Sequence, residues 1–426
     1  MILAILLIGL FFAMAIGVPV AWALGISGLG AILFMDVPLN VVPQKIYTGI
    51  DIFVLMCVPF FILAGEIMRV GITKRLLDFA VLVVGRIRGG LSLANVIASM
   101  VFGGITGSAI ADSSALGSVE IPMMTKNGYD APFSAAITGA SACIGPIIPP
   151  SIPVVIYSMA VGGVSIGALF AAGMIPGILV GVALMIACYV ISRIRNYPKR
   201  DQKVTAREFL KGLKDATLAI MTPVIILGGI IGGIFSPTEA AAVAVMYSFI
   251  ISYFVFRELK LSDLPQMFVR TAVTSSIVLI IIATSNVFGL VIAFEQVALK
   301  LALILEPMGY VGFLLTVNIM FLIIGTFLDN NPAILILAPI FAPIAVAVGV
   351  HPIHFGIIVI MNLMIGLITP PLGEVLFIVA PLAKVSFEDV AKAVTPFTLV
   401  EIGVLLLVTY VPVVSLWIPR LLGYVQ

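Results

Sequence analysis

Long apolar runs separated by short polar segments extend over almost the whole chain, from Met1 to Val414. A hydrocarbon core about 30 Å thick requires roughly 20 apolar residues per helix, and segments of that kind recur along the sequence. The pattern predicts about ten to twelve membrane crossings, some of them interrupted. We therefore expect an all-α polytopic protein embedded in a lipid bilayer.

Composition supports this prediction and excludes several classes of protein. Apolar residues make up 62% of the chain and charged residues 10%, whereas soluble domains carry about 25% charged residues. Cys57, Cys143 and Cys188 lie singly in apolar runs, and their spacing indicates neither a metal site nor a disulfide framework. We expect no resident cofactor, no metal except the sodium considered below, and no nucleic-acid partner.

Two basic segments indicate how the chain sits in the membrane. Residues 193–214 form the longest polar stretch, which the positive-inside rule places in the cytoplasm. Within it, Thr205 and Glu208 have the spacing of a capping box, so a helix is expected from Ala206. Residues 73–88 alternate basic with apolar side chains, which is typical of a helix lying in the membrane interface. A plain cytoplasmic loop is the alternative for this second segment.

The chain contains an internal repeat at an offset of 221 residues, which places Gly104 on Gly325. At the same offset, further glycines and prolines coincide: Pro122 with Pro343, Gly128 with Gly349, Gly145 with Gly366, and Pro149 and Pro150 with Pro370 and Pro371. Both halves thus contain a polar segment rich in small residues, an apolar run, a Pro and Gly turn, and a second apolar run with tandem prolines.

The tandem prolines predict that one helix in each half breaks in mid-membrane, at residues 145–151 and 366–373. Proline removes a backbone donor and disfavours helix at the preceding residue. Irregular backbone at that depth is tolerated where protein or a water-filled cavity satisfies its polar groups. Interrupted segments at corresponding places in two halves indicate the binding site of a secondary transporter. Two ordinary proline kinks in a helical bundle are the alternative.

The polar segment ahead of each break is predicted to be the tip of a re-entrant helical hairpin. Residues 103–114 are rich in glycine and hydroxyl groups, and residues 325–332 are rich in side-chain oxygen. Asn331 before Pro332 suits a helix N-cap followed by its first turn. Close packing of helices through small residues is the alternative reading of these segments.

Each hairpin tip, lying beside its broken helix, could bind a sodium ion through oxygen ligands. The candidate ligands of the first site are Thr106, Ser108, Asp112, Gly145 and Pro146. Those of the second site are Thr326, Asp329 and Asn330, with backbone near Gly366 and Thr369. Half-helix N-termini would face an anionic substrate between the two sites. The candidate substrate-binding residues are Ser108, Ser113, Pro149, Pro150, Asn331, Pro370, Pro371 and Glu374.

Several other polar residues have a simpler structural interpretation. Residues 236–239, Ser-Pro-Thr-Glu, form a capping box that opens a helix. Glu66 and Arg69 stand three residues apart and can pair on one helix. His351 and His354 flank a proline with no carboxylate or cysteine nearby in sequence, and we expect both to be loop residues.

These motifs together resemble a known family, the large membrane subunit of tripartite ATP-independent periplasmic (TRAP) transporters. The resemblance is carried by residues 232–243 (GGIFSPTEAAAV), by Thr-Gly-Ser at 106–108 with Ala-Asp at 111–112, and by Gly-Pro at 145–146 with Ile-Pro-Pro-Ser at 148–151. It covers essentially the whole chain.

The resemblance implies an elevator-type, sodium-coupled importer of the bacterial inner membrane, built on inverted repeats. Its substrate would be a small carboxylate such as a C4-dicarboxylate or sialic acid. Its partners would be a separate small membrane subunit of four helices and a periplasmic substrate-binding protein. The sodium sites of the family would fall here on Thr106, Ser108, Gly145, Gly325, Thr326, Gly366 and Thr369. No arginine lies near either tip in sequence, so we expect backbone amides, hydroxyls and sodium to bind the carboxylate.

By analogy with the family, the chain divides into a scaffold and a transport domain. Scaffold helices are expected in residues 1–60 and 215–260, and a helix with an interfacial arm in residues 61–90. The transport domain would comprise residues 91–192 and 261–394, with the cytoplasmic loop at 193–214 and a C-terminal helix at 395–426.

Three other functions remain open at this point. A self-sufficient dicarboxylate and sodium symporter would share the hairpins but need neither partner. An intramembrane enzyme would need a positioned nucleophile or metal set, and the chain has no His-Glu-x-x-His or Gly-x-Ser-x-Gly motif. A passive channel would lack sodium coupling.

Overall fold

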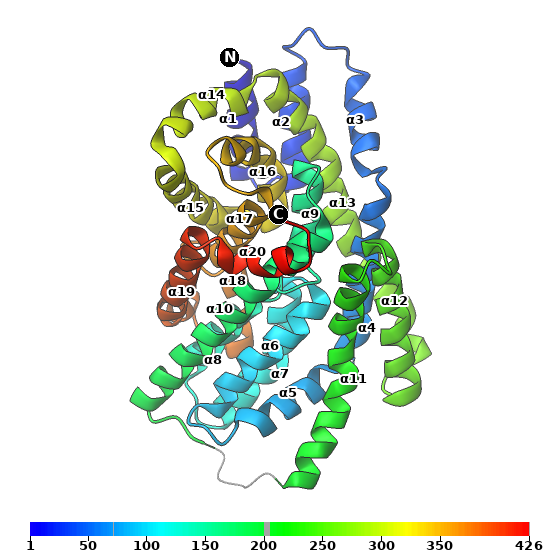
Figure 1. Ribbon diagram of the computed structural model, residues 1–426, viewed down its shortest axis with the longest axis vertical. Helices are drawn as coiled ribbons and strands as arrows, with labels where there is room; N and C mark the ends of the chain where they lie inside the picture. Colours follow the sequence, from blue (N-terminus) through cyan, green and yellow to red (C-terminus); the bar gives the residue numbers. More distant parts are fainter. Residues whose placement is uncertain (71, 200–204, 426) are drawn as a thin grey trace.

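The computed structural model describes residues 1–70, 72–199 and 205–425, and the regular secondary structure of this part is entirely helical (Figure 1). The first half contains α1 (Ile2–Ala15), α2 (Val20–Ile32), α3 (Val41–Ile50), α4 (Cys57–Arg69), α5 (Ile72–Val84), α6 (Gly90–Thr106), α7 (Ala109–Lys126), α8 (Ala131–Ala142), α9 (Ile152–Val161) and α10 (Ile166–Ile194). The second contains α11 (Ala206–Ile231), α12 (Pro237–Ile250), α13 (Leu264–Phe294), α14 (Val297–Leu305), α15 (Gly309–Phe327), α16 (Asn330–Ala347), α17 (Pro352–Gly366), α18 (Glu374–Ala383), α19 (Phe387–Tyr410) and α20 (Val413–Leu421).

Seven helical segments in the described ranges are long and apolar enough to cross a membrane, and the bent pair α3–α4 makes an eighth. The prediction of ten to twelve crossings exceeds this number because the hairpin limb α6 and the half-helices α9, α17 and α18 are apolar but too short to span alone. The polytopic, all-helical class is confirmed. Arg200 and Lys203 of the basic segment lie outside the described residues.

The two repeats share one order of helices. In the first, α6 and α7 form a hairpin, and the chain continues through α8, an irregular segment and α9. In the second, α15 and α16 form the hairpin, followed by α17, an irregular segment and α18. Both predicted breaks are therefore present, the first between Ala142 and Ile152 and the second between Gly366 and Glu374.

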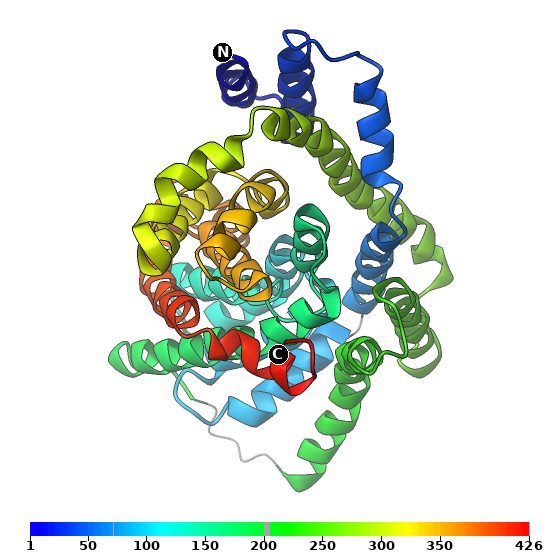
Figure 2. The same ribbon diagram turned by 45° about the horizontal axis from the view of Figure 1, so that its top comes forward.

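The repeats lie together in the middle of the molecule, partly surrounded by a curved row of helices (Figure 2). We call α1–α4 with α11–α13 the arc, and α6–α9 with α15–α18 the paired body. α13 falls within residues 261–394, which were expected to belong to the transport domain, but its contacts group it with the arc. Within the arc, α13 packs against α2, α3 and α4, and α12 packs against α4 and α11. Contact between the two groups runs mainly through α13 against α16 and α4 against α6.

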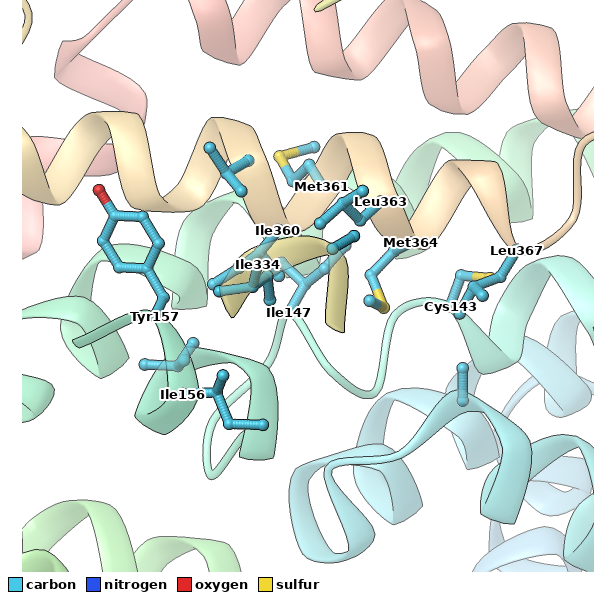
Figure 3. Close-up of a cluster of buried hydrophobic side chains, with 14 of the residues drawn as sticks. Cys143, Ile147, Ile156, Tyr157, Ile334, Ile360, Met361, Leu363, Met364 and Leu367 are labelled. Atoms are coloured by element: carbon cyan, nitrogen blue, oxygen red, sulfur yellow. The ribbon is translucent and has the colours of Figure 1, made fainter. Parts of the chain in front are cut away.

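The half-helices form the centre of the paired body. Every residue of α8 from Phe133 and every residue of α17 from Ile353 is buried. Figure 3 shows Met364 of α17 near Cys143, and Ile360 of α17 near Ile147, with Cys143 and Ile147 both in the first irregular segment. Helices that are apolar all round suit this central position.

The two helix starts predicted from capping boxes are confirmed. Both capping boxes are present: Glu208 N donates to Thr205 Oγ1 at 3.3 Å, and Ser236 N donates to Glu239 Oε2 at 2.7 Å. Residues 73–88 lie largely in α5, which packs against α6 and α11.

Two predictions about caps and loops were wrong. Asp329, rather than Asn331, is the N-cap of α16, because the helix begins at Asn330 and the Asp329 carboxylate accepts from Asn330 N at 2.8 Å. His354 is a buried residue of α17 rather than a loop residue. Its ring nitrogens lie 2.7 Å from Ser415 Oγ and 3.2 Å from Thr409 O, which ties α17 to the C-terminal helices.

Candidate functional site

The tip of the first hairpin is a two-residue connection, Gly107 and Ser108. Gly107 has a φ of +61°, and a Cβ there would lie 2.9 Å from the carbonyl oxygen of Pro150, so both the conformation and the close approach require glycine. Ser108 caps α7 by accepting from Ala111 N at 3.3 Å. The tip is thus held against the carbonyl-rich break of the same repeat.

A glycine crossing joins the first hairpin to the first break. A Cβ added to Gly103 would overlap the Cα of Gly145, so the two backbones are in direct contact. Asp112 is fully buried beside this crossing. Its Oδ1 accepts a hydrogen bond from Thr106 Oγ1, while its Oδ2 has no hydrogen-bond partner in the part of the chain described and adjoins Gly145. A buried carboxylate oxygen left without a donor fits a bound cation.

The second hairpin makes the same kind of crossing. Gly325 and Gly366 are in backbone contact, and a Cβ on Gly325 would lie 3.3 Å from the Cα of Gly366. Thr326 and Thr369 each donate to a carbonyl of their own helix, at 2.8 and 2.7 Å, which leaves their oxygen lone pairs available as acceptors. Asn330 Nδ2 faces Met364 Sδ at 3.9 Å. In each repeat, a predicted ion-site glycine of the break, Gly145 or Gly366, is thus in backbone contact with a glycine of the adjoining hairpin.

A cavity of about 490 Å³ lies between the two hairpin tips and the arc. Six of the predicted site residues line it: Thr106, Ser108, Asp329, Asn330, Asn331 and Glu374. The first turns of α7, α9, α16 and α18 all reach its wall, so four helix N-termini converge on one space. Each N-terminus carries roughly half a positive elementary charge, and the cavity is therefore suited to an anion.

The other predicted substrate-binding residues do not line this cavity. Ser113 is buried and donates to Ile110 O at 3.0 Å. Pro149 and Pro150 are buried in the first break, whereas Pro370 and Pro371 are exposed in the second. Pro146 contributes its carbonyl to the local structure, because that oxygen accepts from Ser151 Oγ, the cap of α9.

Glu66 and Arg69 of α4 also line the cavity, a role that the sequence did not reveal. The predicted pair is present, with Glu66 Oε2 3.9 Å from Arg69 Nη2, and the same oxygen lies 3.6 Å from Arg270 Nη1. Among the residues that the structure describes, Arg69 is the only basic one lining the cavity, against the acidic Glu66, Asp329 and Glu374. Arg69 is distant from both tips along the sequence but adjoins them in space, and the expectation that backbone amides, hydroxyls and sodium bind the carboxylate stays a prediction.

A buried polar network behind the first crossing was also missed. Glu120 is fully buried and accepts from Asn95 Nδ2, which also donates to Thr138 Oγ1 at 2.7 Å. Ser141 Oγ donates to Asn95 Oδ1 at 2.8 Å. The only signal in sequence was an ionisable residue within an apolar hairpin.

Comparison with known proteins agrees with this architecture. The family described as "Tripartite ATP-independent periplasmic transporter, DctM component" matches residues 7–414. The sialic acid TRAP transporter large permease protein SiaM of Vibrio cholerae is 41% identical over 98% of both chains. The C4-dicarboxylate TRAP transporter large permease protein DctM of Pseudomonas aeruginosa is 40% identical over 94% of both chains.

A solved transporter structure supports the fold alone. The YdaH transporter of Alcanivorax borkumensis superposes with a TM-score of 0.62 at 15% identity, covering 89% of this chain and 88% of that one. The family match and the two relatives span nearly the whole sequence. The chain therefore belongs to the DctM family of large permease components of TRAP transporters, which are transporters and not enzymes, and is a multi-pass protein of the bacterial inner membrane.

Proposed function

We propose that this chain carries out sodium-coupled import of a small carboxylate as the large permease of a binding-protein-dependent transporter. The observation that carries the proposal is the single cavity shared by both hairpin tips, each tip lying at a glycine crossing. The relatives are named for sialic acid and for C4-dicarboxylates, which differ in size but all carry a carboxylate.

Sodium binding at the first crossing is supported by Asp112. Its Oδ2 is buried without a hydrogen-bond partner, and a hard cation would supply the missing positive charge. At the second crossing, the hydroxyl oxygens of Thr326 and Thr369 and the side chain of Asn330 offer neutral oxygen ligands. Because each tip also lines the cavity, an ion at either crossing would stiffen the wall to which the substrate binds.

Substrate binding is supported by the positive ends of four helices and by Arg69. A carboxylate in the cavity would accept hydrogen bonds from the free backbone N–H groups at the first turns of α7 and α16. Arg69 projects from the opposite, arc side and can bind a carboxylate with two parallel hydrogen bonds. The nearby acidic side chains Asp329 and Glu374 would disfavour an anion unless sodium is bound as well, which links the two ligands.

The boundary between arc and paired body is the surface along which we propose that an elevator movement occurs. One wall of the cavity comes from α4 and α13, and the other comes from the hairpin tips. Arg69 ends α4 just before α5, and α5 packs against α11 near the basic segment. If that segment is cytoplasmic, the cavity faces inward, and the arrangement is the one that releases substrate to the cell.

Reconstitution tests the proposal directly. Proteoliposomes holding this chain with its small membrane subunit should take up sialic acid or succinate only when an inward sodium gradient and the binding protein are both present. Sodium-driven uptake without either partner would instead establish a self-sufficient symporter. Uptake independent of sodium would contradict both proposals.

A further inference from the structure

A second cavity, of about 280 Å³, lies along the boundary that separates the arc from the paired body. Its arc side comes from α3 and α13, and its body side comes from α9 and α16. The residues that give it chemical character are Lys45, Ser285 and Asn286, while the remaining walls are apolar or glycine. We call this space the outer cavity, and the one at the hairpin tips the inner cavity.

The outer cavity has the charge of an anion site. Lys45 is the only charged residue that lines it, and no salt bridge joins Lys45 to a carboxylate in the described ranges. Ser285 is 5% exposed, and its Oγ has no hydrogen-bond partner among the described residues. A buried hydroxyl without a partner costs free energy that a bound ligand can recover. A cation and an unused hydroxyl thus meet in one protein-lined space.

The outer and inner cavities are built from the same helices at different heights. On α13, Thr274 lines the inner cavity and Ser285 the outer one, eleven residues apart in the sequence. At 1.5 Å per residue, these two residues lie roughly 16 Å apart along the helix axis, while Val278 of the inner cavity and Ile282 of the outer one are separated by about one turn. On α16, Asn331 lines the inner cavity and Leu335 the outer one, and α9 contributes to both cavities in the same way.

The bent pair α3–α4 supplies one basic residue to each cavity. Lys45 lies on α3 and Arg69 at the end of α4, on either side of a bend of 57°. Gly49 holds α3 against α13 beside the outer cavity, because a Cβ there would overlap the side chain of Asn286. The arc therefore presents a cation at both ends of the boundary. In this structure the hairpin tips lie at the cavity lined by Arg69 and not at the one lined by Lys45.

We propose that the outer cavity is a second binding station for the carboxylate of the substrate, with Lys45 as its cationic ligand and Ser285 as a hydrogen-bonding ligand. This inference rests on the proposed function. The substrate would meet Lys45 when it enters from the outside and Arg69 when it is released inside. Lys45 accordingly determines affinity for external substrate, and Arg69 determines affinity for internal substrate.

Sided transport kinetics test this assignment. In proteoliposomes of the full complex, Lys45→Gln should raise the KM for external substrate roughly tenfold, since a hydrogen bond to a charged group is lost. It should leave the KM for exchange with internal substrate unchanged, and Lys45→Arg should restore most of the external affinity. Lys300→Gln is a matched control, because Lys300 is exposed and pairs with Glu295 at 3.2 Å away from both cavities.

Chemical labelling gives a second readout that does not depend on turnover. None of the native cysteines, Cys57, Cys143 and Cys188, lines the outer cavity, so Ser285→Cys would place a thiol on its wall. An anionic thiosulfonate added from outside should modify this variant, and saturating substrate should slow the modification. Adding Lys45→Gln to Ser285→Cys should slow modification by the anionic reagent but not by a neutral one.

The outcomes separate this inference from the proposed function. If the unmodified complex shows no sodium-dependent uptake, the proposed function fails and the inference fails with it. If the unmodified complex transports but Lys45→Gln behaves like Lys300→Gln, or changes external and internal KM equally, only the outer station is overturned. Modification of Ser285→Cys that is indifferent to substrate would overturn it as well.

Discussion

The two glycine crossings follow the same chain path but differ in chemistry. At the first, the carboxylate of Asp112 is buried against Gly145 and the whole break from Cys143 to Pro150 is enclosed or nearly so. At the second, the acidic residue, Asp329, caps α16 at the cavity wall, and the break is exposed at Pro370 and Pro371. A duplicated backbone has thus kept its contacts while its side chains diverged.

The polar residues behind each crossing show the same divergence. The first repeat contains an ionisable group, Glu120, in its buried network, and the residue at the same place in the second repeat is Phe341. The second repeat contains amides instead, with Asn362 Nδ2 donating to Asn318 Oδ1 at 2.7 Å. The comparison indicates a more enclosed first half that contains buried carboxyl groups and a second half with a more exposed break.

Substitution of the crossing glycines should have the largest effect and should affect both halves. Gly145→Ala would place a Cβ against Gly103 Cα and Asp112 Oδ2, and Gly366→Ala would place one against the backbone of Gly325. Backbone cannot yield as a flexible side chain can, so each variant should lose about 3 kcal/mol and nearly all sodium-dependent uptake. Thermal unfolding measures the loss of stability, and uptake into proteoliposomes measures the loss of transport.

A suitable control for the glycines is Gly403→Ala, since a Cβ at Gly403 has nothing within 4 Å. It should transport like the unmodified chain. Normal uptake in Gly145→Ala would show that the backbone contact is not required.

The aspartates should respond unequally if the first half is the more enclosed. Asp112→Asn removes the buried charge beside the crossing and should raise the sodium concentration for half-maximal uptake roughly thirtyfold. Asp329→Asn retains a capping oxygen at a partly exposed position and should raise it by roughly fivefold. Equal shifts in sodium dependence would contradict the comparison.

Glu120 offers a test of the charge behind the first crossing. Glu120→Gln keeps the acceptor for Asn95 and removes a buried ionisable group, so stability should change by less than about 1 kcal/mol. Glu120→Ala should cost about 2 to 3 kcal/mol, because it leaves a cavity and an unpaired amide. The free energy of unfolding of the two variants can be compared in detergent. Equal losses of stability would indicate that the charge of Glu120 itself is needed.

The smallest expected effect is a pH dependence confined to the second repeat. His351 caps α17 by accepting from Ile353 N at 3.2 Å on Nδ1, whereas Asp130, at the same place in the first repeat, makes no such cap. Burial, and then the charge of Arg420, lower the pKa of His351 below its ordinary value of 6.5. The cap therefore requires the neutral ring.

The sign of this pH dependence follows from the lowered pKa. The stability from His351 is fully present above pH 6.5 and is lost as pH falls through the lower folded-state pKa. His351→Asn should keep the cap and reduce this acid loss by up to about 1 kcal/mol. The unfolding temperatures of the unmodified protein and of His351→Asn, measured from above pH 6.5 downward, test this. Parallel curves would exclude His351 as the cause of the acid loss of stability.

Backbone features could be predicted from sequence, whereas the contents of the cavity largely could not. Tandem prolines and capping residues act within a few positions, so the breaks after Ala142 and Gly366 and the cap at Ser236 follow from local physics. Arg69 and Glu120 act across long separations in the chain, and their partners depend on how whole helices pack. Even the cap at Asp329 required knowing which of three polar residues ends the irregular segment.

A consequence of the glycine crossings concerns how such proteins diversify. A contact between two glycine backbones depends on the path of the chain and not on a particular side chain. Its geometry can therefore persist while the residues around it change. The residues of the cavity wall, by contrast, can be exchanged one at a time. Evolution could thereby alter the wall of the cavity without disturbing the crossings, where we propose that sodium binds.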